Sequence, residues 1–261
     1  MRALQIAATG MSAQQMRVDT VANNLANMST TGYNARRAEF ADLHYQQFTR
    51  AGSISSSDGT IVPTGVQLGL GARPSSVAMQ VAQGALVQTG GDLDLAIEGR
   101  GWLEVVLPDG RAAYTRDGGL KSNGDGLIVT SEGYEVAPGI VIPPETRSLS
   151  INAEGEVWAY FSDRVQPERL GQLTLSGFTN ERGLEALGSN LFVETEASGP
   201  PFVGNPGEEG LGTLRQGYLE ESSVDPVREL TEMIKAQRGY ELNAKVITAS
   251  DQMLAATTQV R

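Results

Sequence analysis

The two ends of the chain constrain its fold more than any other feature, because both carry the spacing of a helical seam. Apolar and small residues recur there at alternating steps of four and three, which predicts helices that bury a narrow stripe. The N-terminal seam comprises Leu4, Ala8, Met11, Gln15, Val18, Ala22 and Leu25. The C-terminal seam comprises Leu230, Met233, Gln237, Tyr240, Ala244, Ile247, Asp251 and Leu254.

Start and stop signals bound these helices. Asp225 can cap the second helix and Pro226 suits its first position, so we expect that helix from there to about Thr258. The first pattern stops before Gly32, which supplies a turn. Neither seam is as wide as the stripe of about 100° that covers a globular core. We therefore expect the helices to pair with each other and to need burial from other chains, which indicates an assembly protein.

Between the helices the sequence is typical of antiparallel β structure. Strand-like runs alternate with turn signals at 108–110, 123–126 and 154–155. The predicted fold class is α+β, with long terminal helices paired as a coiled-coil-like domain, an extended arm and a turn-rich antiparallel β domain. The expected boundaries are 1–32 for the first helix, 33–83 for the arm, 84–221 for the β domain and 222–261 for the second helix.

Part of the arm, residues 46–76, is polar, rich in glycine and serine, and weakly periodic. Such a stretch is typical of a long loop or of an extended arm. A loop of this length inside a compact domain is uncommon and is usually functional or disordered. Both interpretations stay open from the sequence.

The composition excludes several classes of protein. The 261 residues carry 31 acidic and 20 basic side chains, and the formal charge of -11 argues against a nucleic-acid surface. Without cysteine, neither a disulfide nor a thiolate metal site can form. No run of about 18 apolar residues could span a membrane, and no apolar segment of about 7 residues at the N-terminus predicts a signal peptide. We expect a cytoplasmic chain or export by a route that reads no cleaved signal.

No motif predicts catalysis. His44, the only histidine, cannot form a triad or a histidine-rich metal site and is interpreted as a surface residue. A calcium loop that starts at Lys121 fails because lysine offers no oxygen ligand, and a hairpin turn explains the same residues. Acidic residues could form a glycosidase pair, but no positioned base or nucleophile accompanies Asp92, Asp94, Glu98 and Glu104. We expect no catalytic, cofactor-binding or metal-binding residue.

Four ordered blocks resemble the bacterial flagellar rod and hook family. They read ANNLANMSTTGYNARRAEF at 22–40, DLAIEGRGWLEV at 94–105, YTRDGGL at 114–120, and RELTEMIKAQRGYE at 228–241 followed by SDQML. The blocks span nearly the whole chain. Two residues depart from the family pattern. Gly239 stands where the family usually has alanine, and His44 stands where an apolar residue usually follows Phe40 in an export element.

The resemblance implies a structural subunit and not an enzyme. Subunits of this family pass unfolded through the flagellar type III export channel, without a cleaved signal peptide. They then stack helically into a hollow tube in the basal body, with terminal helices inside and β domains outside, and the tube transmits torque across the periplasm to the hook. The implied partners are further copies of the chain, the proximal rod proteins, the hook protein, the P- and L-ring proteins and the export apparatus, with no nucleic acid, membrane insertion or cofactor.

Within the family, the arm resembles that of the distal rod branch, which is associated with a straight, stiff rod. The arm residues concerned are Gln46, Pro63, Gly65, Gly69 and Gly71. Two alternatives stay open. One is a proximal rod or hook subunit of the same family. The other is a periplasmic polysaccharide-binding or cell-wall-cleaving protein, which would leave the terminal seams unexplained.

Three asparagines stand at the end of the first helix, although asparagine is a poor helix former. They could mark a frayed helix end. Alternatively, in a tube of packed helices, Asn23 and Asn27 could form amide hydrogen bonds that set the register between neighbours. The predicted assembly interface comprises Leu4, Ala8, Met11, Val18, Ala22, Asn23, Asn24, Leu25, Asn27, Leu230, Met233, Gln237, Tyr240, Ala244, Ile247 and Leu254.

Overall fold

The chain folds into two compact units in a computed structural model that describes residues 2–52, 64–164, 166–208 and 210–259. Unit 1 comprises Met1–Leu25, Arg36–Ala78 and Pro226–Arg261. Unit 2 comprises Ala26–Ala35 and Met79–Asp225. The combination of terminal helices with a central antiparallel β region confirms the predicted α+β class.

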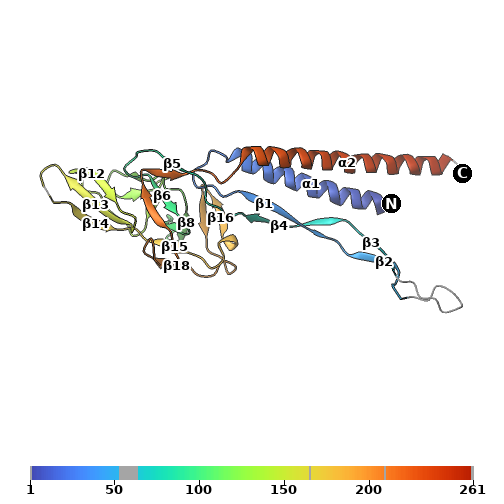
Figure 1. Ribbon diagram of the computed structural model, residues 1–261, viewed down its shortest axis with the longest axis horizontal. Coiled ribbons are helices and arrows are strands. Elements are labelled where there is room, and N and C mark those ends of the chain that lie inside the picture. Colours follow the sequence, from blue (N-terminus) through green and yellow to red (C-terminus); the bar gives the residue numbers. More distant parts are fainter. Residues whose placement is uncertain (1, 53–63, 165, 209, 260–261) are drawn as a thin grey trace. The chain divides into compact units, whose positions relative to one another are not determined.

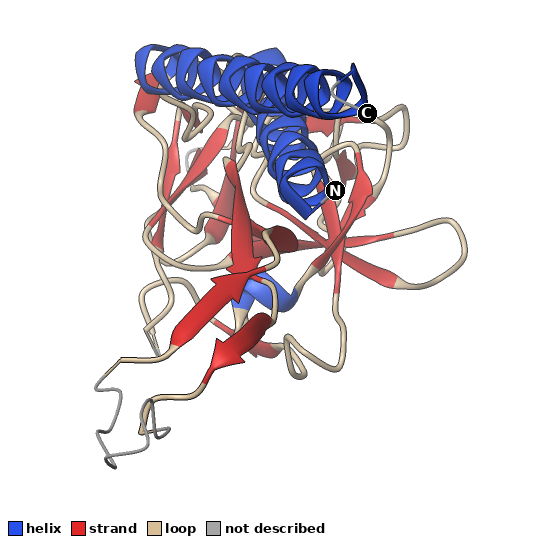
Figure 2. Cartoon of the chain, turned by 90° about the vertical axis from the view of Figure 1, so that its right-hand side faces the viewer, coloured by secondary structure: helices blue, strands red, loops and turns tan. Residues whose placement is uncertain are grey.

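Unit 1 contains both long helices and most of the arm. Helix α1 spans Arg2–Ala26 and helix α2 spans Pro226–Gln259. The prediction of a helix at each end is therefore confirmed, and α2 begins at the proline that its start signal indicated. The two helices run antiparallel and cross obliquely (Figures 1 and 2).

The described part of the arm is a β ribbon. Its strands are β1 (Arg36–Asp42), β2 (Tyr45–Thr49), β3 (Val66–Gly69) and β4 (Ala72–Met79), which pair as β1 with β4 and β2 with β3 (Figure 1). The long-loop interpretation is wrong for these residues. Every residue of β2 is exposed, so the strand buries no face and carries no alternating pattern that the sequence could reveal. Pro63 lies outside the described residues.

Unit 2 is an antiparallel β domain, as predicted. Its strands are β5 (Leu86–Gln88), β6 (Leu95–Glu98), β7 (Trp102–Val106), β8 (Ala112–Thr115), β9 (Lys121–Ser122), β10 (Ile128–Val129), β11 (Glu135–Val136), β12 (Thr146–Ile151), β13 (Glu156–Phe161), β14 (Glu168–Gln172), β15 (Leu175–Gly177), β16 (Glu185–Gly188), β17 (Leu191–Val193), β18 (Phe202–Gly204), β19 (Thr213–Gln216) and β20 (Tyr218–Glu220). A short 3-10 helix, η1, spans Glu181–Gly183.

The strands of unit 2 form one large sheet and several smaller ones. The large sheet runs β16-β17-β8-β7-β11-β10-β9, with β15 bridging β7 and β18. The smaller sheets are β12-β13-β14, β19-β6 and β20-β5. Several pairings join strands that are consecutive in sequence, which is the arrangement that short hairpin turns produce. Others, such as β19 with β6 and β20 with β5, join strands that lie far apart in the chain.

The predicted turns are confirmed. Strands β7 and β8 pair around 108–110, β9 and β10 around 123–126, and β12 and β13 around 154–155. In the second turn, Asn123 Oδ1 accepts hydrogen bonds from the backbone N–H of Asp125 at 3.0 Å and of Leu127 at 2.9 Å. This side chain thus closes a hairpin, in agreement with the rejection of a calcium loop.

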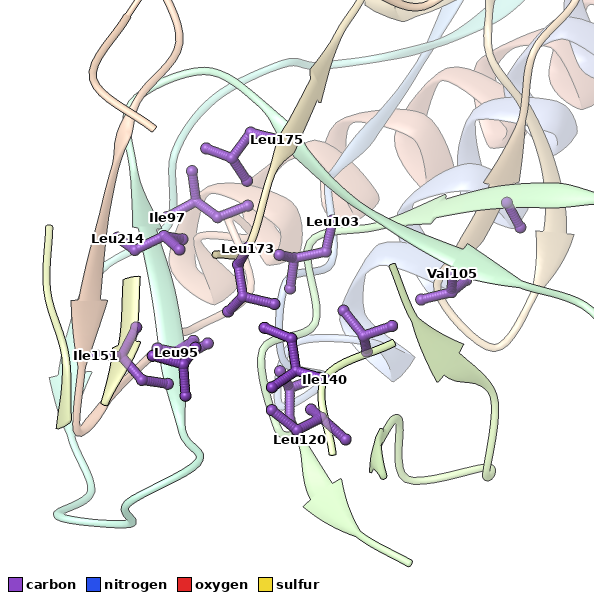
Figure 3. Packing of buried hydrophobic residues seen from close by; sticks show 14 of the residues in the cluster. Leu95, Ile97, Leu103, Val105, Leu120, Ile140, Ile151, Leu173, Leu175 and Leu214 are labelled. Atoms are coloured by element: carbon purple, nitrogen blue, oxygen red, sulfur yellow. The ribbon is translucent and has the colours of Figure 1, made fainter. Parts of the chain in front are cut away.

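The core of unit 2 is aliphatic. Figure 3 shows side chains from strands and from the loops between them converging in its centre, among them Leu95, Leu103, Ile140, Leu173 and Leu175. A second cluster is aromatic, and in it Trp102 packs edge-on against Phe192 at 4.9 Å between ring centroids. These two clusters are sufficient to give unit 2 a hydrophobic core of its own.

A buried ion pair fastens strand β20 to this core. Arg116 Nη2 lies 2.9 Å from Glu220 Oε2, and both side chains are about as buried as the core leucines. The guanidinium also donates to the carbonyl oxygens of Gly99 and Gly101, while Glu220 Oε1 accepts from the backbone N–H of Gly84. Because every charged group has hydrogen-bond partners, the pair is tolerated inside the domain.

Candidate assembly interface

Helices α1 and α2 meet through polar and small residues. Arg17 forms an ion pair with Glu232, and Asn24 Nδ2 donates to Glu229 Oε2 at 3.1 Å. Further along, Gly10 faces Asn243 and Gly239 faces Gln14. As the numbers rise along α1 they fall along α2, which fixes the antiparallel pairing.

Two glycines make this close approach possible. A β-carbon added at Gly10 would lie 2.9 Å from Asn243 Nδ2, and one added at Gly239 would lie 3.0 Å from Gln14 Cδ. Each amide side chain therefore occupies space that a larger residue on the facing helix would fill. Gly239, the departure from the family pattern, has a packing reason in this chain.

The contact between the helices lies one residue before the seam that the sequence suggested, on both helices. On α1 it follows Ala7, Gly10, Gln14, Arg17, Val21 and Asn24, and on α2 it follows Glu229, Glu232, Ala236, Gly239 and Asn243. Spacing alone favoured the row with the larger apolar residues. Within the chain, the row that contains Gly10, Gly239 and the buried alanines makes the contact between the helices. Its small residues let the two backbones come close.

The predicted interface residues consequently lie beside or away from this contact. Asn24 is the one that is buried. Leu4, Met11, Val18, Leu25, Asn27, Met233, Ala244 and Ile247 are half-buried, whereas Ala8, Ala22, Asn23, Leu230, Gln237, Tyr240 and Leu254 are exposed. The same helices expose further large apolar side chains, including Ile234, Leu242 and Val246.

Asn24 uses its whole amide group. Its Nδ2 donates to the carbonyl oxygen of Arg36 at 2.8 Å and to Glu229, and its Oδ1 accepts from the backbone N–H of Arg36 at 2.9 Å. The side chain is 1% exposed. The amide thereby binds both backbone groups of Arg36, the first residue of β1, as a neighbouring strand would. It also binds Glu229 in the first turn of α2. The register-setting bonds expected of Asn23 and Asn27 concern neighbours in a tube and stay a prediction.

The other two asparagines lie differently. Asn27 Oδ1 accepts from Thr30 Oγ1 at 3.2 Å, and the backbone N–H of Thr30 donates to the Asn27 carbonyl, so this residue helps to close the turn after α1. Asn23 is exposed on α1. The frayed-end interpretation is wrong, because α1 continues to Ala26 and the turn after it is hydrogen-bonded.

The charge pairing at the helix contact alters one ionisation. The hydrogen bond from Lys235 is the largest cause that lowers the pKa of Glu232, and the guanidinium of Arg17 acts in the same direction. Lys235 lies on α2 like Glu232, so only the contribution of Arg17 depends on the pairing of the helices.

The arm contacts α1 at three places along the helix. Near the C-terminal end of α1, Arg36 binds Asn24. Midway, the backbone N–H of Ala72 donates to Thr9 Oγ1 at 3.4 Å, and a β-carbon at Gly71 would lie 2.1 Å from that oxygen. At the N-terminal end, the guanidinium of Arg2 lies 5.0 Å from the ring centroid of Phe48. Of the predicted arm residues, Gly71 thus permits close packing on α1.

The remaining predicted arm residues belong to the ribbon itself. Gln46 lies opposite Leu68, and Gly69 lies opposite Tyr45. Gly65 directly precedes β3, and a β-carbon there would clash with the carbonyl oxygen of Thr49. These residues allow the strands to pair closely and do not build a pocket.

Two of the acidic residues considered for hydrolysis have structural partners. Glu104 accepts from Ser176 Oγ at 3.2 Å, and Glu98 lies 3.9 Å from Arg215. His44 is exposed, as expected. Within the described residues, no group of three or more histidine and carboxylate side chains could hold a metal ion, and no helix has the length and apolarity needed to cross a membrane.

Comparisons with known proteins match the helices and the β domain separately. The family described as "Flagella basal body rod protein" matches residues 4–34, which include most of α1. "Flagellar basal body rod FlgEFG protein C-terminal" matches residues 215–260, and "Flagellar hook protein FlgE/F/G D1 domain" matches residues 96–159.

Whole-chain relatives decide the family. The Caulobacter vibrioides "Flagellar basal-body rod protein FlgG" is 51% identical over 261 residues, which cover 100% of both chains. The chain belongs to the FlgG family of flagellar basal-body rod proteins. The FlgG protein of Agrobacterium fabrum is 47% identical over 97% of each chain. A Bacillus subtilis "Flagellar hook-basal body complex protein FlhP" is 32% identical over 100% of each chain.

The FlgG match agrees with how the molecule is built. The family segments at 4–34 and 215–260 contain the two helices whose contact includes Asn24 and Glu229. These segments carry the predicted interface, whereas the segment at 96–159 lies in unit 2.

Proposed function

We propose that this chain is a structural subunit of the flagellar distal rod. It polymerises helically into a hollow, stiff shaft that transmits torque across the periplasm to the hook, and it catalyses no reaction. One observation carries the proposal: unit 1 pairs its helices through small and polar residues and leaves Leu230, Ile234, Leu242 and Val246 exposed. Apolar side chains exposed in this number on paired helices favour burial against other chains.

The exposed and half-buried seam residues form the interface between copies in this proposal. They comprise Leu4, Ala8, Met11, Val18, Ala22, Asn23, Leu25, Leu230, Met233, Gln237, Tyr240, Ala244, Ile247 and Leu254. Segments 1–32 and 222–261 build the inner wall of the tube, 84–221 forms its outer surface, and 33–83 supplies the arm that stiffens the shaft.

The partners follow from the position of a rod. Besides further copies of the chain, we propose contacts with the proximal rod proteins and the hook protein at the two ends, and with the P- and L-ring proteins around the outside. The chain reaches this place through the flagellar type III export apparatus, without a cleaved signal peptide.

The alternative within the family is a proximal rod or hook subunit. The relatives named FlgG are 51% and 47% identical, against 32% for the hook-basal body complex protein FlhP, and this difference favours the rod branch. The arm supports the distal position, since we expect a distal rod subunit to carry it.

Limited proteolysis of the purified chain, followed by circular dichroism, tests the proposal. We expect protease to remove roughly residues 1–35 and 225–261 first, because helices with uncovered seams fray in a lone subunit. Unit 2 should survive as a β-rich fragment. Protection of both ends in a monomer would contradict the proposal, as would normal motility in cells whose only copy carries Leu230→Asp.

A further inference from the structure

Asn24 joins three segments that are distant in the sequence. Its amide binds both backbone groups of Arg36, which begins β1, and the carboxylate of Glu229 in the first turn of α2. Helix α1, the arm and helix α2 therefore meet at one buried side chain in unit 1.

Asparagine is the residue that suits this position. The site needs two donors and one acceptor on a short planar group, and an asparagine amide supplies them all. Aspartate would keep the acceptor but lose both donors and would bring a second carboxylate next to Glu229. Serine offers one donor, and glutamine is one methylene longer.

Neither element that Asn24 binds is well stabilised by itself. A two-stranded ribbon such as β1 with β4 is marginal in water. The contact between α1 and α2 buries only Ala7, Val21 and Ala236 among its apolar side chains in the described part of the chain. A bond shared by both elements makes the formation of each depend on the other.

We propose that Asn24 is the positioning residue that couples the docking of α2 on α1 to the seating of the arm. The pairing of the helices and the packing of the arm on α1 then occur together. A subunit whose helices are paired therefore also has its arm in place on α1. The coupling is a property of the single chain. Its consequence for the rod rests on the proposed function.

The second contact of the arm provides a readout far from Asn24. Thr9 and Gly71 touch where the arm crosses α1, fifteen residues before Asn24 and therefore about 22 Å away along the helix. Because the chain has no cysteine, a short thiol-reactive cross-linker would join the pair Thr9→Cys/Ala72→Cys only where the arm lies on α1.

The experiment compares variants of this cysteine pair in cells that lack the natural protein. The variants are Asn24→Asp, Glu229→Gln, their combination, and Gln252→Glu as the matched control, an exposed amide of α2 outside the proposed interface. Asn24→Asp should lower the cross-linked fraction about tenfold, in line with the loss of a buried, charge-assisted hydrogen bond. Glu229→Gln in the same chain should recover part of it, because glutamine can donate to the new carboxylate while the carbonyl oxygen of Arg36 stays without its donor. Gln252→Glu should change it by less than about twofold.

Three results would overturn the coupling. They are an unchanged cross-link in Asn24→Asp, no recovery in the combined variant, and an equal loss in Gln252→Glu. Counting rods in isolated basal bodies separates this inference from the proposed function. If the natural chain builds no rod while the cross-links follow the expected order, the proposed function fails and the coupling stands.

Discussion

The two units of the molecule use apolar side chains in opposite ways. Unit 2 buries them in an aliphatic core and an aromatic cluster. In the described part of unit 1, the buried hydrophobic residues are only Ala7, Ala13, Val21 and Ala236. Larger apolar residues of unit 1 are exposed, among them Phe48, Leu68, Leu230, Ile234, Leu242 and Val246. Unit 2 therefore has the core of an independent domain, while unit 1 lacks one.

Charge divides in the same way. Unit 1 has 11 of the 20 basic and 8 of the 31 acidic side chains, which gives it a net charge of +3. Unit 2 has the other 9 basic and 23 acidic side chains, which gives it a net charge of -14, and the two charges sum to -11. Like charge keeps copies of unit 2 from associating with one another, whereas unit 1 carries little charge to oppose contact. The acidic excess of the chain therefore lies in unit 2.

The largest expected effect would come from breaking the ion pair inside unit 2. Arg116→Met leaves Glu220 buried without its cation, so the free energy of unfolding of unit 2 should fall by about 3–5 kcal/mol. Denaturant unfolding followed by tryptophan fluorescence measures it. Arg111→Met is the control, because the Asp109–Arg111 pair is exposed. An equal loss in both variants would mean that burial does not govern the effect.

Truncation of one leucine in each unit tests the contrast directly. Leu103→Ala in the core of unit 2 should cost about 2–5 kcal/mol of unfolding free energy. Leu230 is 48% exposed, so Leu230→Ala should lower the unfolding free energy of the monomer by less than about 0.5 kcal/mol. The order should reverse for assembly, measured as rods per cell, where Leu230→Ala is the damaging change. Normal rods from Leu230→Ala would remove this residue from the interface.

Acid should weaken unit 1 through Glu232. The pKa of Glu232 is lowered mainly by Lys235 of the same helix and further by Arg17 of α1, so ionised Glu232 stabilises α2 and, through Arg17, the helix pair. This stabilisation is present above the ordinary pKa of 4.5 and disappears as the pH falls through the lowered pKa. Light scattering of assembled chain during acid titration measures the loss. The assembled Glu232→Gln variant should be less stable than the natural chain near neutral pH. Its stability should fall less on acidification. An unchanged titration curve would show that this pair does not contribute.

The smallest effect is expected at Gly239. Alanine should favour helix α2 by about 0.5–1 kcal/mol, but its β-carbon would lie 3.0 Å from Gln14 Cδ, so that side chain must shift. The two contributions oppose each other, and thermal unfolding of the assembled chain should change by only a few degrees. Gly10→Ala against Asn243 is the matched variant. A large loss in either would show that the amide side chains cannot move.

Much of the fold could be predicted from local patterns. The proline at 226 set the start of α2, and the Asp-Gly and Asn-Gly pairs set the hairpins of unit 2, because these residues act through the backbone of their own segment. The ribbon strands of the arm could not be found in this way. Every residue of β2 and most residues of β3 are exposed, so the pairing of these two strands is not visible in the pattern of hydrophobicity.

The sequence by itself determined that both ends are long helices, that the middle is an antiparallel β domain, and that the charge is strongly acidic. The tertiary structure alone decided which rows of the helices touch and which asparagine is buried between them. Heptad spacing cannot distinguish adjacent rows of one helix, since each row repeats with the same period. The choice falls to the closeness of the two backbones, which Gly10 and Gly239 permit, and to the partners that Asn24 finds 12 and 205 residues away.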